Sequence, residues 1–107
     1  MEVIIKSVNF KASKQLEELI IEKVNKLFHH SNNIIQALVV LREEEKKGHE
    51  NKSCEIKLVV PGYDHFAKKK TESYEKSITQ AVDSLQNVIL KTKKRSIAKK
   101  HSHNPIS

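Results

Sequence analysis

The sequence contains little of what several classes of protein require. Its single cysteine, Cys54, excludes a disulfide within the chain. Two glycines and two prolines among 107 residues are too few turn formers for a many-stranded barrel. The longest unbroken apolar run, Ala37 to Leu41, falls far short of the ~20 residues that a membrane span needs. We therefore expect neither a disulfide-stabilised fold, nor a barrel, nor a transmembrane segment.

Acidic residues are absent beyond Asp83, although the chain holds 13 of them. Six of its 20 basic residues lie in that acid-free part, and they account for six of the seven net positive charges: Lys91, Lys93, Lys94, Arg95, Lys99 and Lys100. A charge that serves solubility alone is interspersed with the opposite sign, whereas a block of one sign suits a polyanionic surface. Nucleic acid is therefore the first candidate partner.

The remaining composition is that of one compact α+β domain. With 37% hydrophobic and 31% charged residues, the chain is too apolar to be disordered, and its length suffices for one two-layer core. Met1 leads into a strand-like segment instead of a basic region followed by an apolar run, which predicts a cytoplasmic protein. We expect the domain to cover residues 1–95, followed by a basic, flexible tail at 96–107.

Two segments have helical periodicity. In the first, Ser13 is a candidate N-cap, and apolar residues then recur at spacings of three and four as far as Phe28. The second begins at Thr71 or Ser73 and reaches about Arg95, with apolar positions at Tyr74, Ile78, Ala81, Val82, Leu85, Val88 and Ile89. Both patterns predict amphipathic helices.

Four segments, 2–8, 34–42, 53–60 and 64–70, are predicted to be strands. The third alternates most clearly, with Cys54, Ile56, Leu58 and Val60 on one face. The element order predicts a β-α-β-β-β-α fold, with a four-stranded sheet and both helices on one face. The other face should be open and should carry Lys6, Gln36, Arg42 and Lys57 together with Ile4, Leu38, Val40 and Val59.

The end of the second helix is the strongest candidate for an RNA contact. Lys91, Lys94 and Arg95 share a flank by helical spacing, while Lys93 points elsewhere. One or two cations would satisfy the helix dipole, and six exceed that need. At Lys68, Lys69 and Lys70, phosphate contact and protection of an edge strand are equally good interpretations, and the middle lysine should face away from the outer two.

The sequence gives no sign of catalytic chemistry. Cys54 lies on the apolar face of a strand, where we expect a buried structural thiol instead of a nucleophile. The histidines lack the paired spacing of a metal site, and the two glycines are isolated from each other. The five aromatic residues form no alternating pair for base stacking, which favours recognition of the RNA backbone. We expect no enzyme, cofactor, metal or small-molecule substrate.

Several short motifs, in their order and spacing, resemble the ribosome hibernation promoting factor and ribosome-associated inhibitor family over residues 1–95. They are Asn9 after the first strand, the helix ending near Lys26-Leu27-Phe28, Val39-Val40-Leu41-Arg42, Val60-Pro61-Gly62, Tyr74 leading into Ile78, and Leu85 followed by Lys91-Thr92-Lys93. Small residues are typical of the family where Phe66, Lys68 and Lys70 stand here.

The resemblance implies a short-form protein that binds the small ribosomal subunit in the channel of messenger and transfer RNA. It would silence translation by occlusion and would be a monomer when free. The resemblance transfers phosphate contacts with 16S-type ribosomal RNA to Arg42, Lys91, Lys93, Lys94 and Arg95, and then to Lys68, Lys69 and Lys70. The family includes both factors that pair ribosomes and inhibitors that keep them single.

Two other interpretations stay open at this point. A generic double-stranded RNA-binding domain also has three strands between helices, but it lacks the opening strand and carries its lysines at the start of its last helix. A protein-interaction module would instead use the open sheet face, where Leu38, Val40 and Val59 supply apolar surface. The salt dependence of binding separates RNA binding from protein docking. Binding to RNA weakens as salt rises, with a log-log slope of roughly −0.7 to −0.9 per phosphate contact, whereas an apolar docking face should barely respond.

Overall fold

The computed structural model describes residues 2–31, 33–44 and 50–102, with side chains described as far as Lys91. Its elements follow the predicted β-α-β-β-β-α order: β1 (Glu2–Val8), α1 (Lys14–His30), β2 (Gln36–Glu43), β3 (Lys52–Val60), β4 (Tyr63–Thr71) and α2 (Tyr74–Ser102). The predicted connection between β2 and β3 includes positions 45–49, which lie outside the described residues.

One sheet contains all four strands in the order β1-β2-β3-β4. β1 and β2 pair in parallel, because α1 carries the chain back along the sheet between them. The other two pairs are antiparallel, and Pro61 and Gly62 make the tight turn between β3 and β4. Gly62 has a φ of +91°, a conformation that glycine adopts without steric cost.

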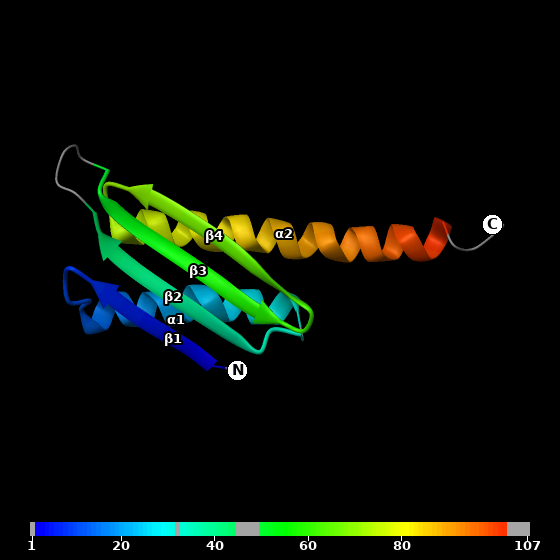
Figure 1. Ribbon diagram of the computed structural model, residues 1–107, viewed down its shortest axis with the longest axis horizontal. Helices are drawn as coiled ribbons and strands as arrows, with labels where there is room; N and C mark the ends of the chain where they lie inside the picture. Colours follow the sequence, from blue (N-terminus) through cyan, green and yellow to red (C-terminus); the bar gives the residue numbers. More distant parts are fainter. Residues whose placement is uncertain (1, 32, 45–49, 103–107) are drawn as a thin grey trace.

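Both helices cover the same face of the sheet, as predicted (Figure 1). They run side by side, and α2 packs against β3, β4 and α1. Alternate strand residues supply the core beneath them, because successive side chains in a strand point to opposite faces. The fully buried strand residues are Ala37, Leu41, Cys54, Ile56 and Leu58.

Each helix begins directly after a serine: Ser13, the predicted N-cap, and Ser73, one of the two predicted starts of the second helix. The Ser13 hydroxyl accepts a hydrogen bond from the Leu16 amide at 3.1 Å. The Ser73 hydroxyl likewise accepts one from the Lys76 amide at 3.1 Å. Each bond satisfies a backbone donor that has no partner within the helix, which fixes where the helix starts.

A buried hydrogen-bond cluster fixes the start of α2 against the sheet. The Ser77 hydroxyl accepts from the Thr71 amide at 3.0 Å and donates to the Lys52 carbonyl at 2.6 Å. Ser77 is completely buried, so these bonds are shielded from water. They join the beginning of β3, the end of β4 and the first turn of α2.

α2 is much longer than the strands it covers. Its 29 residues span about 43 Å, whereas the nine residues of β4 span about 30 Å. The helix continues to Ser102, beyond the end near Arg95 that the apolar spacing indicates. Neither glycine nor proline occurs between Ser96 and Ser102, so no residue in this stretch breaks the helix.

Candidate nucleic-acid interface

The face of the sheet opposite the helices carries the predicted mixture of cations and apolar side chains. The register arranges it in four rows across the strands: Glu2, Gln36, Val59 and Asp64; Ile4, Leu38, Lys57 and Phe66; Lys6, Val40, Glu55 and Lys68; Val8, Arg42, Ser53 and Lys70. We call this surface the open face. Its rows contain five cations and three carboxylates.

Lys68 and Lys70 lie on the open face beside acidic side chains. Lys68 Nζ is 3.4 Å from Glu44 and 3.5 Å from Glu55, and Lys70 Nζ is 3.5 Å from Glu44. Burial opposes ionisation of Glu44, but hydrogen bonds and charges from the two lysines outweigh it and lower its pKa. Both lysines are therefore partly neutralised within the fold.

Arg42 and Lys6 differ from these two lysines. Arg42 is half-buried in β2, and Lys6 is exposed in β1. Among the described residues, no carboxylate lies within 4 Å of either cationic group. Within the described part of the chain, neither cation would have to give up an ion pair to bind a phosphate.

The eight predicted contact residues do not all lie on the same surface of the described structure. Lys69 lies opposite Cys54 in the register and therefore on the helix side of β4, which confirms that it faces away from Lys68 and Lys70. Lys91 is exposed on α2. The predicted side-chain contacts of Lys93, Lys94 and Arg95 lie outside the described residues, although their backbone belongs to α2.

α2 leaves the core where its basic stretch begins. Among the α2 side chains described, which end at Lys91, Ile89 is the last buried one, whereas Leu90 is 38% exposed and Lys91 is exposed. Figure 1 shows the later turns of the helix extending past the end of the sheet. The basic stretch that begins at Lys91 thus lies on the part of α2 that projects beyond the sheet.

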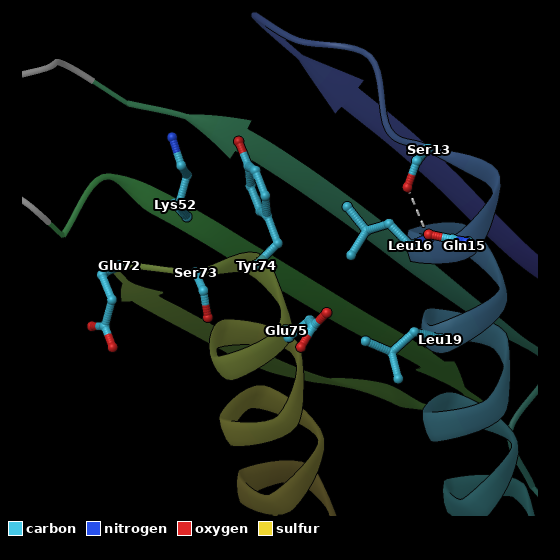
Figure 2. A pocket seen from close by; sticks show the side chains of 9 residues that line it. All are labelled: Ser13, Gln15, Leu16, Leu19, Lys52, Glu72, Ser73, Tyr74 and Glu75. Carbon is cyan, nitrogen blue, oxygen red and sulfur yellow. Dashed lines mark hydrogen bonds between the residues drawn. The ribbon is translucent and has the colours of Figure 1, made fainter.

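A groove of about 580 Å³ lies at the opposite end of α2, between the first turns of the two helices (Figure 2). Leu16 and Leu19 of α1 point toward α2, and Glu75 of α2 points toward α1. Among the described residues that line it, Lys52 is the one cation, and Glu72 also lies there. This mixture of charges does not favour a polyanion.

The cation in the groove already has partners. Lys52 Nζ lies 3.5 Å from Glu43 and 5.8 Å from the centroid of the Tyr74 ring. Tyr74 stacks on Phe10 with ring centroids 4.4 Å apart, and its burial, together with the nearby Glu43 charge, raises its pKa to about 12. These contacts hold the loop before α1 against α2, a structural role.

The described residues do not form a reactive thiol, an acid–base pair or a metal site from the candidates in the sequence. Cys54 is completely buried, and burial together with the adjacent Glu55 charge raises its pKa to about 12, so its thiol stays protonated at neutral pH. His65 and Asp64 face opposite sides of β4, because His65 stacks edge-on with Tyr63 while Asp64 pairs with Lys57. No three metal-binding side chains cluster within the described ranges.

The open face also carries an exposed aromatic residue, Phe66, that the sequence did not mark as a contact. Phe66 is 60% exposed and stands directly opposite Lys57. The sequence predicted no base stacking because its five aromatic residues form no alternating pair, and Tyr63 indeed lies on the other side of β4. The sequence nevertheless placed Phe66 two residues before Lys68. Because residues two apart in a strand share a face, this spacing could have predicted that Phe66 lies beside Lys68 on the open face.

Comparison with known proteins links the whole described domain to one family. The family model for sigma 54 modulation protein / S30EA ribosomal protein matches residues 3–97. That match includes the sheet, α1 and most of α2. No curated protein is similar enough in sequence to be matched. None of the described helices is long and apolar enough to cross a bilayer.

Two solved structures share the fold. The N-terminal domain of Protein Y from Thermus thermophilus has a TM-score of 0.71 and 21% identity, and the match covers 83% of this chain and 96% of that one. A ribosomal subunit interface protein from Coxiella burnetii has a TM-score of 0.76 and 16% identity, with 87% and 98% covered. At these identities the likeness concerns the fold.

Proposed function

We propose that this chain, which belongs to the sigma 54 modulation protein / S30EA ribosomal protein family, is a ribosome-binding factor that inhibits translation. Its partner is the small ribosomal subunit, where it occupies the channel of messenger and transfer RNA and contacts 16S-type ribosomal RNA. The family match over residues 3–97 is the observation that carries this proposal.

The mechanism is occlusion, for which no chemical step is needed. A folded domain in the channel excludes messenger and transfer RNA by its volume, and contacts to phosphates hold it there. Such contacts position a protein without reading base sequence. A factor of this kind would act in the cytoplasm on idle ribosomes and would leave when competing ligands or salt weaken its phosphate contacts.

The positive charges contribute unequally to this mechanism. The basic stretch of α2, with Lys91, Lys93, Lys94 and Arg95, supplies the main contact, because no acidic residue follows Asp83 to compensate it. Arg42 on the open face comes next, since no carboxylate of the described residues pairs with it. Lys68 and Lys70 must exchange carboxylates for phosphates, and Lys69 faces the helix side.

Co-sedimentation with isolated small ribosomal subunits tests the proposal. The wild-type protein should sediment with the subunits at low salt, resist an excess of duplex RNA, and dissociate as salt rises. Each phosphate contact steepens the log-log salt dependence by roughly 0.7 to 0.9. If the duplex RNA displaces the protein from the subunits, the protein is instead a generic double-stranded RNA-binding module.

A matched pair of charge variants locates the contact. Replacing Lys91, Lys93, Lys94 and Arg95 by glutamine should abolish sedimentation while leaving the circular dichroism spectrum unchanged. Replacing Lys11, Lys14, Lys23 and Lys26 by glutamine removes the same charge near α1 and should have little effect. Equal binding by both variants would refute the role of the projecting helix.

A further inference from the structure

The open face carries an exposed aromatic ring that core packing does not explain. Phe66 is the most exposed large hydrophobic residue of the described part, at 60%, although it lies in the middle of a regular strand. A phenylalanine in that position gains little from folding, since most of its surface stays in water. Its ring is therefore free to bind something else.

Two cations flank this ring, and Asp64 lies two residues before it on the same face of β4. Lys57 is directly opposite on β3, and Lys68 is two residues along β4 on the same face. Lys57 pairs with Asp64 at 3.5 Å, both side chains being more than 40% exposed. Lys68 is 41% exposed and pairs with Glu55 and Glu44. Glu55 and Glu44 are 27% and 25% exposed, so all of these pairs remain open to water. Surface pairs of this kind contribute little stability, so a phosphate can replace the carboxylates.

A protein partner fits this surface poorly. In the register Lys57 separates Phe66 from Leu38, and Ile4 lies beyond Leu38, so the row is not a continuous apolar strip. A stable protein interface typically buries about 800 Å² on each partner around a dry centre. An isolated ring between lysines instead resembles what single-stranded nucleic acid requires, namely a stacking surface with cations for the adjacent phosphates.

We propose that Phe66 stacks on one unpaired base of the RNA that this chain binds, while Lys57 and Lys68 contact the phosphates beside that base. This inference rests on the proposed ribosomal RNA partner and adds a specific contact to it. It extends the interface from the projecting end of α2 to the open face, and it adds a preference for unpaired RNA that phosphate contacts alone do not give.

Tryptophan fluorescence tests the stacking directly, because the chain has no tryptophan of its own. In a Phe66→Trp variant, single-stranded oligoadenylate of about ten nucleotides should quench the emission in a saturable way. A fully paired RNA hairpin should not. The matched control is Tyr63→Trp, which places the reporter at a 55% exposed site on the other side of β4 and should not be quenched.

Binding to small ribosomal subunits gives the second readout. Phe66→Ala and Phe66→Leu should each weaken binding by roughly 5-fold to 100-fold, the loss expected from one base–aromatic stack. Phe66→Trp should bind at least as well as the wild type. The leucine variant separates stacking from simple hydrophobic contact, since it retains apolar surface without an aromatic ring.

The outcomes separate this inference from the proposed function. If the wild type and Phe66→Ala bind subunits equally well, stacking is wrong and ribosome binding stands. If the wild type binds no subunits, ribosome binding is wrong, and quenching of Phe66→Trp by the single strand alone would still support a stacked base. Self-association that Phe66→Ala abolishes would assign the open face to a second copy and overturn stacking.

Discussion

The two faces of the sheet are made by alternate residues of the same four strands, yet they have opposite properties. Toward the helices stand Val39, Ile56 and Leu58, which are at most 1% exposed. Toward solvent stand Lys57 and Phe66, at 46% and 60%. Adjacent residues of one strand therefore contribute either to the core or to a surface that is free to bind.

The comparison shows how a small domain combines stability with binding. Burial of the helix-side residues stabilises the fold, so the open face can carry five cations and an exposed ring without a large cost. The same division recurs along α2, whose first turns are buried up to Ile89 and whose later turns project from the sheet. Substitutions on the two faces should consequently affect different measurements.

The largest contrast should come from neighbouring residues of β3. Ile56→Ala removes a completely buried side chain and should lower the free energy of unfolding by about 2–5 kcal/mol. Lys57→Ala, one position away, should change it by about 0.5 kcal/mol or less. Urea unfolding of both variants measures the difference. Similar losses in the two variants would show that the open face is also part of the core.

Ser77→Ala should have the next largest effect. Without its hydroxyl, the Thr71 amide and the Lys52 carbonyl lose their shared partner in a buried site. An unsatisfied buried group costs about 1–3 kcal/mol, so stability should fall by that amount. Ser84→Ala, a partly exposed residue of the same helix, is the control. An unchanged unfolding midpoint for Ser77→Ala would contradict the anchoring role of this cluster.

A smaller effect is expected at Asn9, where β1 ends. Asn9 has a φ of +70°, and its side-chain amide donates to the Glu43 carbonyl at 3.1 Å. Asn9→Ala loses this bond and strains the backbone, which should cost about 1–2 kcal/mol. Asn9→Gly loses only the bond and should be less destabilising, because glycine tolerates positive φ. The ranking of the two midpoints is the test.

The smallest effect on stability, about 0.5 kcal/mol or less, should come from Glu44→Gln. The folded state lowers the pKa of Glu44, so its ion pairs with Lys68 and Lys70 stabilise the fold above the unfolded pKa of this carboxyl. That contribution disappears as the pH falls through the lowered folded pKa. Wild type and variant should therefore differ at neutral pH and converge in acid, as urea midpoints can show.

The same variant distinguishes stability from binding. Glu44→Gln releases Lys68 and Lys70 from a carboxylate, so its affinity for small ribosomal subunits should rise while its stability falls. Glu22→Gln, which removes an exposed carboxylate on α1, should leave affinity unchanged. If the affinity of Glu44→Gln for the subunits falls instead, the ion pairs of Glu44 with Lys68 and Lys70 help to form the interface.

The repeating patterns of the sequence were enough to predict the element order, the cap of the first helix and the buried face of the third strand. For the second helix they left the start between Thr71 and Ser73. Ser13 and Ser73 have the local chemistry of helix caps, and alternation assigns Cys54, Ile56 and Leu58 to one face because a strand allows no other arrangement. The end of α2 was harder to predict, since the apolar spacing stops at Ile89 while the helical backbone continues without it.

The accumulation of cations beyond Asp83 is a property of composition, and the sequence alone determined it. Which cations are available was decided by the tertiary structure, because Glu44 and Glu55 are distant from Lys68 and Lys70 in the chain and meet them only when β2, β3 and β4 assemble. The same holds for Phe66, whose exposure depends on both helices covering the other side of the sheet. Local patterns fix the secondary structure, whereas contacts between distant segments fix the charge and exposure of each side chain.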